Sequence, residues 1–384
     1  MHVTHAAPAM TVELSTGTLD LFVDGDVDID AFCDVAARAN PRRGFLIVSR
    51  VLGRHLPARP ADMRRAMDGL AARVGSDLPG PIVFLGMAET ATALGQGCFA
   101  AWQARHPDAE AVYLQSSRQR VAGAEVVARF EEGHSHATSH LVQIANPVIR
   151  ARVAAARSLV IVDDECSTGA TFVAAATALL DAMPQLERIE TCSITDWSDG
   201  SYLDAMPHPA AARAIVGGRM RWSAAASAPP AELAAGSNAP GAAPDAGMNS
   251  RTGLLHPESA QRAVVTAVPG ERVLVLGEGE HSYEALLVAE EIERGGGIAA
   301  VQCITRSPAL LGGAMASKSI FNDSYDSGAP CFLYNMLGHA PARVVIVTEV
   351  PADQQVEAQA ALAALGSSIP VDVVACRYAA EESR

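Results

Sequence analysis

Residues Leu159–Thr171 read LVIVDDECSTGAT, and this stretch is the strongest indication of fold and function in the chain. It opens with four apolar residues that favour a buried strand, continues with the carboxylates of Asp163 and Asp164, and ends in a Ser-Thr-Gly turn before a predicted helix. Backbone N–H groups of such a turn and of a helix N-terminus suit a phosphate dianion. Two adjacent carboxylates can accept hydrogen bonds from vicinal sugar hydroxyls. The stretch therefore predicts a sugar-phosphate site.

The same string resembles the phosphoribosyl diphosphate (PRPP) signature of type I phosphoribosyltransferases, in which a hydrophobic strand precedes two acidic residues and a hydroxyl-rich loop. The alternative is an ordinary parallel sheet whose strand ends in Asp before a Gly-Thr turn, but here the whole spacing of the signature is filled. The resemblance implies that Asp163 and Asp164 hold the ribose hydroxyls and bind Mg²⁺ mostly through water. It also implies a PRPP-binding loop made of Glu165, Ser167, Thr168, Gly169, Ala170 and Thr171.

Length and charge narrow the class of protein. The 384 residues are 49% hydrophobic, which suits two domains more readily than one. The formal net charge of −14 argues against a nucleic acid as the main partner, because binding of a phosphate backbone relies on clustered Lys and Arg. No apolar run reaches the roughly 18 residues that span a bilayer, and the first residues lack the pattern of a signal peptide. We therefore expect a cytoplasmic protein without a membrane partner.

Alternation of apolar runs with helical patterns predicts two α/β domains, each with a parallel sheet. A flexible tail is expected over 1–18, and a type I phosphoribosyltransferase-like parallel sheet flanked by helices over 19–222. Residues 223–256 are rich in Ala, Pro and Gly, which predicts a flexible linker. A second, smaller α/β domain is expected over 257–384.

The predicted elements place the strand ends, where ligands of open α/β sheets bind. In the first domain, strands are predicted over Gly44–Ser49, Pro81–Gly86, Ala111–Gln115 and up to Asp164, and helices over Arg64–Arg73, Thr90–Arg105 and Thr171–Ala182. In the second domain, strands are predicted over Arg272–Gly279, Ile298–Thr305, Arg343–Val350 and Pro370–Tyr378, and helices near Tyr283–Arg294 and Ala352–Leu365.

A small-residue turn follows the strand Pro81–Gly86 and leads into a helix. It consists of Met87, Ala88, Glu89 and Thr90. One interpretation is an ordinary helix start with Thr90 as the N-cap. The other, implied by the resemblance, is the loop whose backbone N–H groups hold the pyrophosphate of PRPP. The position of the turn before the PRPP-like string favours the second interpretation.

The polar segment Ser116–His140 is predicted to be a long loop, and such loops inside compact domains are often functional lids. Type I enzymes have a mobile loop in this place that closes over PRPP, so Arg118 and Arg120 are candidates to neutralise the leaving pyrophosphate. Histidines of the same segment are candidates for phosphate contact or acid-base catalysis, namely His134 and His136. The less favoured alternative is a zinc site made of His134, His136 and His140.

Two further sets of residues follow predicted strands and could recognise an anionic acceptor or form a second site. They are Arg50, Arg54 and His55 in the first domain, and Thr305, Arg306 and Ser307 in the second. The alternatives are a solvated basic loop and an ordinary turn, respectively. The segment Gly277-Glu278-Gly279 also follows a strand, but without a third glycine it is a weak signal for a nucleotide loop.

Several segments together resemble one bacterial family, the phosphoribosyltransferase-like proteins of tellurite-resistance gene clusters that carry a C-terminal TRSP domain. The matching strings are FLIVSRVLGRHLP, GMAETATALG, FEEGHSHATSH, CITRSP and FLYN. The resemblance implies PRPP-dependent phosphoribosyl transfer to a small nucleobase-like acceptor, in the synthesis of a nucleoside-like metabolite. It leaves the oligomeric state open, although related transferases are often homodimers. The alternatives are a PRPP-sensing protein without turnover and a nucleobase salvage enzyme.

Overall fold

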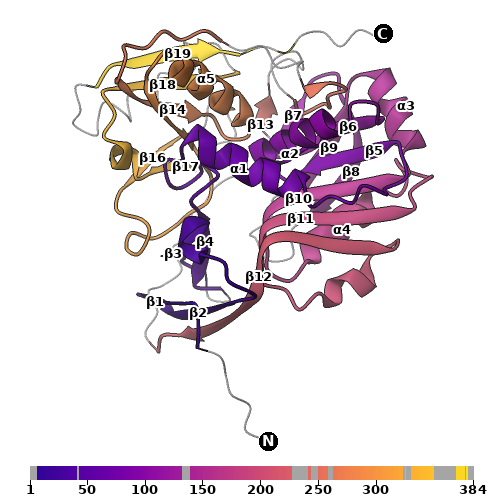
Figure 1. The fold of residues 1–384 in the computed structure, drawn as a ribbon, viewed down its shortest axis with the longest axis horizontal. Helices are drawn as coiled ribbons and strands as arrows, with labels where there is room; N and C mark the ends of the chain where they lie inside the picture. The colour runs from indigo at the N-terminus through magenta and orange to yellow at the C-terminus, as the bar shows by residue number, and fades with distance from the viewer. Residues whose placement is uncertain are drawn as a thin grey trace, which may run out of the picture.

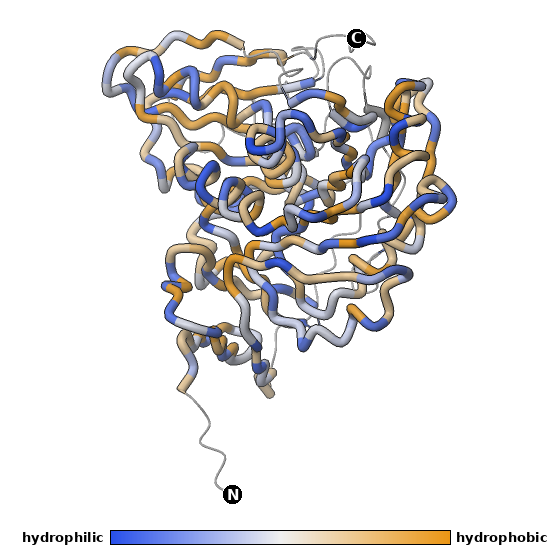
Figure 2. Tube along the Cα trace, turned by 45° about the vertical axis from the view of Figure 1, so that its right-hand side comes forward, coloured by the Kyte–Doolittle hydropathy of each residue, from blue (hydrophilic) through white to orange (hydrophobic). Residues whose placement is uncertain are grey.

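The computed structural model describes residues 7–40, 43–131, 139–226, 241–243, 250–257, 263–322, 325, 330–349, 369–376 and 378. Two sheets form the framework, a large one in the first domain and a smaller one in the second, which lies towards the upper left in Figure 1. Figure 2 shows hydrophobic stretches (orange) alternating with hydrophilic ones (blue) along the chain, and the central strands are rich in buried apolar residues, as expected for sheets that are covered on both faces.

The centre of the large sheet consists of five parallel strands. In spatial order they are β12 (Ala210–Ala224), β11 (Arg188–Asp196), β10 (Ser158–Cys166), β5 (Ile82–Gly86) and β6 (Ala111–Ser117). Residues Leu159–Val162 of β10 are fully buried, because the strand is covered by neighbours on both sides. The predicted fold class, a type I phosphoribosyltransferase-like parallel sheet flanked by helices, is confirmed.

Antiparallel strands extend this sheet at both edges. On one side, β1 (Met10–Leu14) pairs with β2 (Gly17–Val23), and β2 pairs with the end of β12. Residues 10–18, expected to belong to a flexible tail, therefore include a strand and the start of another. On the other side, β9 (Ser139–Ile144) joins β6 to β8 (Glu125–Glu131). The expected long loop Ser116–His140 therefore includes strand β8 and the start of strand β9. These two strands form an antiparallel hairpin, and β9 pairs with β6 at the edge of the sheet.

The helices that join the parallel strands cover opposite faces of the sheet. Helix α2 (Thr92–Arg105) connects β5 to β6, and α4 (Ala170–Ala178) connects β10 to β11. These two connections run in opposite directions across the sheet, so right-handed crossovers place the two helices on opposite faces. The direction reverses between β5 and β10, which makes their carboxyl ends the switch point where open α/β sheets bind ligands.

The remaining elements of the first domain flank this centre. Helix α1 (Pro60–Ala71) packs beside α2, and α3 (Pro147–Ala155) precedes β10. The hairpin of β3 (Cys33–Ala37) and β4 (Phe45–Ser49) stands apart from the main sheet (Figure 1). Short elements complete the domain: η1 (Ile29–Ala31), η2 (Ser201–Ala205), β7 (Gln119–Val121) and β13 (Gly241–Ala243), which pairs with β7.

The second domain is built on a four-stranded parallel sheet. Its spatial order is β15 (Ile298–Cys303), β14 (Arg272–Gly277), β18 (Arg343–Thr348) and β19 (Val371–Ala375). Helix α5 (Tyr283–Arg294) has the predicted bounds. A hairpin of β16 (Lys318–Asn322) and β17 (Pro330–Tyr334) and the turn η5 (Met336–His339) follow β15. The predicted helix over 352–365 lies outside the described residues.

The two domains are docked through main-chain and charged contacts. Ala58 and Val301 exchange hydrogen bonds of 2.9 and 2.8 Å, which attaches the first domain to the edge strand β15. Arg64 of α1 forms an ion pair of 2.6 Å with Glu290 of α5. The carboxyl ends of β14 and β15 consequently face the carboxyl ends of β5 and β6, as the contacts of the next subsection show.

Part of the segment predicted as a flexible linker is ordered and buried. Leu254 exchanges two hydrogen bonds of 2.9 Å with Tyr113 of β6. Arg251 is 1% exposed and lies between two carboxylates of the second domain. These contacts could not be predicted from the hydrophobicity of the segment, because they are made by the main chain and by one charged side chain.

Within the described residues no helix is long and apolar enough to cross a membrane. The cysteines of the described residues are reduced and buried.

Candidate active site

The PRPP-like string lies at the carboxyl end of β10, as predicted. Asp163 and Asp164 are half-buried at the end of the strand, and Asp164 donates its backbone N–H to Asp163 Oδ1 at 2.9 Å. The chain then turns through Ser167 and Thr168 into α4, whose first turn begins at Ala170. The string thus places two carboxylates and a helix N-terminus together at the carboxyl ends of the parallel strands.

Gly169 is the residue that allows this turn. Its φ of +75° lies in the left-handed region, and a Cβ at this position would be 2.0 Å from the ring of Tyr202. Any side chain would therefore meet both a backbone penalty and a rigid aromatic neighbour. The close approach of the turn to Tyr202 depends on glycine.

We expect Gly169→Ala to destabilise the protein by roughly 2–4 kcal/mol, the sum of a left-handed backbone penalty and an overpacking penalty. Gly200→Ala is the matched control, since its φ is +77° but nothing lies within 4 Å of an added Cβ. It should lose only about 1–2 kcal/mol. Denaturant unfolding measures both, and equal losses would show that the contact with Tyr202 is unimportant.

The turn Met87–Thr90 lies beside the PRPP-like string, at the same switch point. Met87 donates its backbone N–H to Val162 O at 3.0 Å, and the Thr90 hydroxyl donates to Asp164 Oδ1 at 2.8 Å. The peptide bond between Ala88 and Glu89 is cis. Helix α2 begins only at Thr92, with Ala91 at the N-cap position. Thr90 is therefore not the helix cap, and its hydroxyl binds the acidic pair instead.

Glu89 points from this turn towards the second domain. Its carboxylate Oε1 accepts hydrogen bonds from Arg54 Nη1 at 3.2 Å and from the backbone N–H of Arg306 at 3.2 Å. Arg54 also donates to the carbonyl oxygens of Gly279 at 2.6 Å and Ile304 at 3.3 Å. The Glu89 side chain thus serves in a domain contact, whereas the prediction for this turn concerned its backbone N–H groups.

Glu165, the acidic residue after Asp164, contacts the β3–β4 hairpin. Its carboxylate forms an ion pair of 2.5 Å with Arg43, at the start of the β3–β4 hairpin's second strand. Burial raises the pKa of Glu165, and the opposing charge of Arg43 only partly offsets this effect. Glu165, predicted to belong to the PRPP-binding loop, therefore joins the string Leu159–Thr171 to the β3–β4 hairpin. The sequence holds no local signal for this contact.

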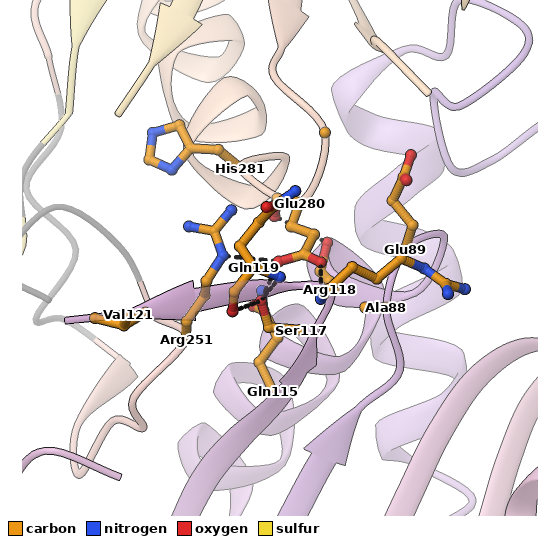
Figure 3. Close-up of polar contacts among 12 residues, drawn as sticks. Ala88, Glu89, Gln115, Ser117, Arg118, Gln119, Val121, Arg251, Glu280 and His281 are labelled. Carbon is orange, nitrogen blue, oxygen red and sulfur yellow. Dashed lines mark hydrogen bonds and ion pairs between the residues drawn. The ribbon is translucent and has the colours of Figure 1, made fainter. Parts of the chain in front are cut away.

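The basic residues of the predicted lid differ in their positions. Arg118 follows β6 directly, and its side chain runs towards the Ala88–Glu89 turn in Figure 3. Arg120 is exposed on β7. His134 and His136 lie outside the described residues. His140 is buried, stacks on Phe130 with ring centroids 4.6 Å apart, and places Nδ1 3.0 Å from Ser116 Oγ.

Members of the two predicted acceptor sets meet at the domain interface, where Arg54 and the backbone N–H of Arg306 both contact Glu89. Arg50 is exposed and paired with Asp34 at 2.5 Å. Burial and the neighbouring arginines lower the pKa of His55 to about 3, so its ring is neutral at pH 7. Thr305 is 1% exposed and its hydroxyl accepts the backbone N–H of Ser307 at 3.1 Å.

The second domain also reaches the end of β6 through Glu280, in the loop that sequence patterns identified only as a weak nucleotide signal. Glu280 accepts hydrogen bonds from the Ser117 hydroxyl at 2.6 Å and from the Arg118 backbone N–H at 2.5 Å. Arg251 completes this network with a bond of 2.7 Å to Glu280 (Figure 3). The sequence shows acidic residues directly after the strand β14, but it does not show that Glu280 binds Ser117, Arg118 and Arg251.

The fold and the two loops at its switch point define the first domain as a phosphoribosyltransferase. A family model described as phosphoribosyl transferase matches residues 32–217, and one described as the TRSP domain C-terminal to it matches residues 249–365. The chain therefore belongs to the phosphoribosyltransferases that carry a C-terminal TRSP domain. The predicted family and enzyme class are confirmed.

Similar solved structures include adenine phosphoribosyltransferase from Rhodothermus marinus, with 16% identity, a TM-score of 0.34, and coverage of 49% of this chain and 95% of that one. The adenine enzyme from Trypanosoma brucei has 14% identity, a TM-score of 0.34, and coverage of 48% and 76%. Orotate phosphoribosyltransferase from Aeropyrum pernix has 19% identity, a TM-score of 0.28, and coverage of 45% and 79%. No curated protein matches the chain.

Proposed function

We propose that this protein transfers the 5-phosphoribosyl group of PRPP to a nitrogen of a nucleobase-like acceptor and releases pyrophosphate. The main support is the placement of two loops at one switch point: the acidic string after β10 and the turn after β5, joined by the bond from Thr90 to Asp164. The family resemblance extends the proposal to the synthesis of a nucleoside-like metabolite that serves tellurite or stress resistance.

Asp163 and Asp164 hold the ribose in this mechanism. Their carboxylates accept hydrogen bonds from the 2- and 3-hydroxyls of the sugar, and charge-assisted bonds of this kind are stronger than neutral ones. The backbone of Ser167–Thr171 and the N-terminus of α4 bind the 5-phosphate. The bond between C1 and pyrophosphate breaks ahead of acceptor attack, so the reaction needs positioning and charge neutralisation more than a covalent nucleophile.

The pyrophosphate lies between the turn Met87–Thr90 and Arg118. The backbone N–H groups of Glu89 and Thr90 and the guanidinium of Arg118 neutralise the charge that develops on the leaving group. Two half-buried carboxylates at one strand end fit Mg²⁺, which takes few protein ligands and keeps much of its water. Asp163 and Asp164 would hold Mg²⁺ mostly through water, and the ion would supply positive charge that helps to neutralise the leaving group.

The assay for this function supplies PRPP, Mg²⁺ and a panel of nucleobases and related heterocycles, and follows pyrophosphate release. We expect release that requires one particular acceptor from the panel. PRPP binding without release by any acceptor would instead favour a sensor, and rapid use of a common nucleobase would favour a salvage enzyme. Absence of PRPP binding would contradict the proposal.

A further inference from the structure

We propose that Glu280 of the second domain is a positioning residue for phosphoribosyl transfer, because it holds the main chain of Arg118 where the side chain can receive pyrophosphate. The inference rests on the function proposed above. It makes the second domain part of the transferase site, although the PRPP-like string lies entirely in the first domain.

Glu280 is a buried carboxylate with donors on both oxygens. Oε1 accepts the Arg118 backbone N–H at 2.5 Å, and Oε2 accepts the Ser117 hydroxyl at 2.6 Å and Arg251 Nε at 2.7 Å. The side chain of Glu280 is only 2% exposed. Charge-assisted bonds in such a dry environment hold their partners firmly, since no water competes for them. The end of β6 is therefore attached to the second domain.

The end of β6 also contacts the turn Met87–Thr90, which follows β5. Ser116 Oγ accepts the backbone N–H of Ala88 at 2.8 Å, and the next two residues, Ser117 and Arg118, are the ones that Glu280 binds. Figure 3 shows Arg118 leaving this point in the direction of Ala88 and Glu89. Arg118 thus starts from the strand end that Glu280 binds, and the turn after β5 is hydrogen-bonded to the same strand end.

A second contact from the same loop acts in the same sense. Gly279, next to Glu280, accepts a bond of 2.6 Å from Arg54, and Arg54 binds the carboxylate of Glu89. This ion pair keeps the negative charge of Glu89 at the domain interface. A free carboxylate in the turn would repel the pyrophosphate of PRPP. The loop 278–282 therefore sets the position of the arginine and of the turn together.

The expected consequence is preorganisation. With its main chain fixed, Arg118 needs no loop ordering when PRPP binds, whereas a loosened strand end would misplace the guanidinium. A misplaced guanidinium loses charge-assisted hydrogen bonds to the pyrophosphate, so we expect Glu280→Gln to weaken PRPP binding by about 10- to 100-fold. Gln keeps the size of the side chain but loses the charge that binds Arg251 and the N–H of Arg118.

A double-mutant cycle separates positioning from general damage. Titration calorimetry with PRPP and Mg²⁺ is applied to the wild type, Glu280→Gln, Arg118→Met and the double variant. If Glu280 acts through Arg118, Glu280→Gln costs less PRPP affinity in the Arg118→Met background than in the wild type. Glu284→Gln is the matched control, because Glu284 is equally buried in the second domain but binds Tyr378. We expect the control to lose stability and to keep the wild-type affinity.

Three outcomes would overturn the inference: wild-type affinity in folded Glu280→Gln, fully additive losses in the cycle, or an equal loss in Glu284→Gln. If Glu280→Gln does not fold, Glu280→Asp takes its place, and wild-type affinity in that shorter variant would count equally against the inference. A wild-type protein that does not bind PRPP would contradict the proposed function instead, so the two failures are distinguishable.

Discussion

Replacing Asp163 and Asp164 together by asparagine is expected to weaken PRPP binding by about 10²- to 10⁴-fold. Each carboxylate should contribute a charge-assisted hydrogen bond to a ribose hydroxyl, and removing the charge costs about 1.5–3 kcal/mol per bond. Asparagine has nearly the same shape and can still accept the hydroxyl of Thr90, so the sheet should stay intact. Titration calorimetry with PRPP and Mg²⁺ measures the loss.

The matched control for this pair is Asp196→Asn. Asp196 ends the neighbouring strand β11, but its carboxylate accepts the backbone N–H of Ser198 at 2.9 Å, within its own turn. We expect this variant to bind PRPP with wild-type affinity. Undiminished binding in the variant of Asp163 and Asp164 would reject the donor site, whatever the control shows.

Arg251→Met is expected to destabilise the protein by about 3–5 kcal/mol, the typical cost of leaving buried charges without their partner. Arg251 is 1% exposed and forms ion pairs with Glu280 at 2.7 Å and with Glu349. The substitution leaves both carboxylates buried without their cation, although Glu280 keeps the Ser117 hydroxyl at 2.6 Å and Glu349 keeps the Tyr325 hydroxyl at 2.5 Å. Arg294→Met is the control, because its ion pair with Glu291 is exposed; it should change stability by less than about 1 kcal/mol.

The deficit of Arg251→Met should shrink as the pH falls from 8 to 5. In the wild type, burial raises the pKa of Glu349, but the charges of Arg251 and His281 outweigh burial and lower it below 4.5. This stabilisation is present above pH 4.5 and is lost only as the pH falls through the lowered pKa. Without Arg251 burial prevails and the pKa rises, so the variant alone regains stability on protonation. Unfolding at several pH values tests this, and a constant deficit would contradict it.

Elements with strong local patterns were predictable. The strands β5, β10, β14, β15 and β18 are apolar runs, and helix α5 has an amphipathic pattern whose bounds the structure reproduces. Parallel strands buried on both faces need such runs, so hydrophobicity alone identifies them. The loop Asp163–Thr171 was predictable for a related reason, because its carboxylates, hydroxyls and glycine are contiguous in the chain.

Strands that are stabilised mainly by pairing with other strands could not be predicted from local patterns. Strand β12 reads AAARAIVGGRMRWSA, which is too polar for a buried run, and it is stabilised by β11 on one side and by β2 on the other. Strand β1 was placed in a tail because it is a short edge strand that needs β2. Strand β8 fell within a predicted loop because nearly half of its residues are exposed, although it pairs with the buried strand β9. In each case pairing with another strand outweighs local propensity, and for β12 one of these strands, β2, is remote in the sequence.

Contiguous residues therefore carry the proposed donor site: the string Leu159–Thr171 by itself predicts a strand, a carboxylate pair and a turn suited to phosphate. The contacts that couple the two domains became visible only in the folded chain. Glu280 meets Arg118 across 162 positions, and Arg54 meets Gly279 across 225. A buried charge must find a partner, because its desolvation is otherwise too costly. Which partner it finds depends on how the two sheets meet, and no local pattern encodes that.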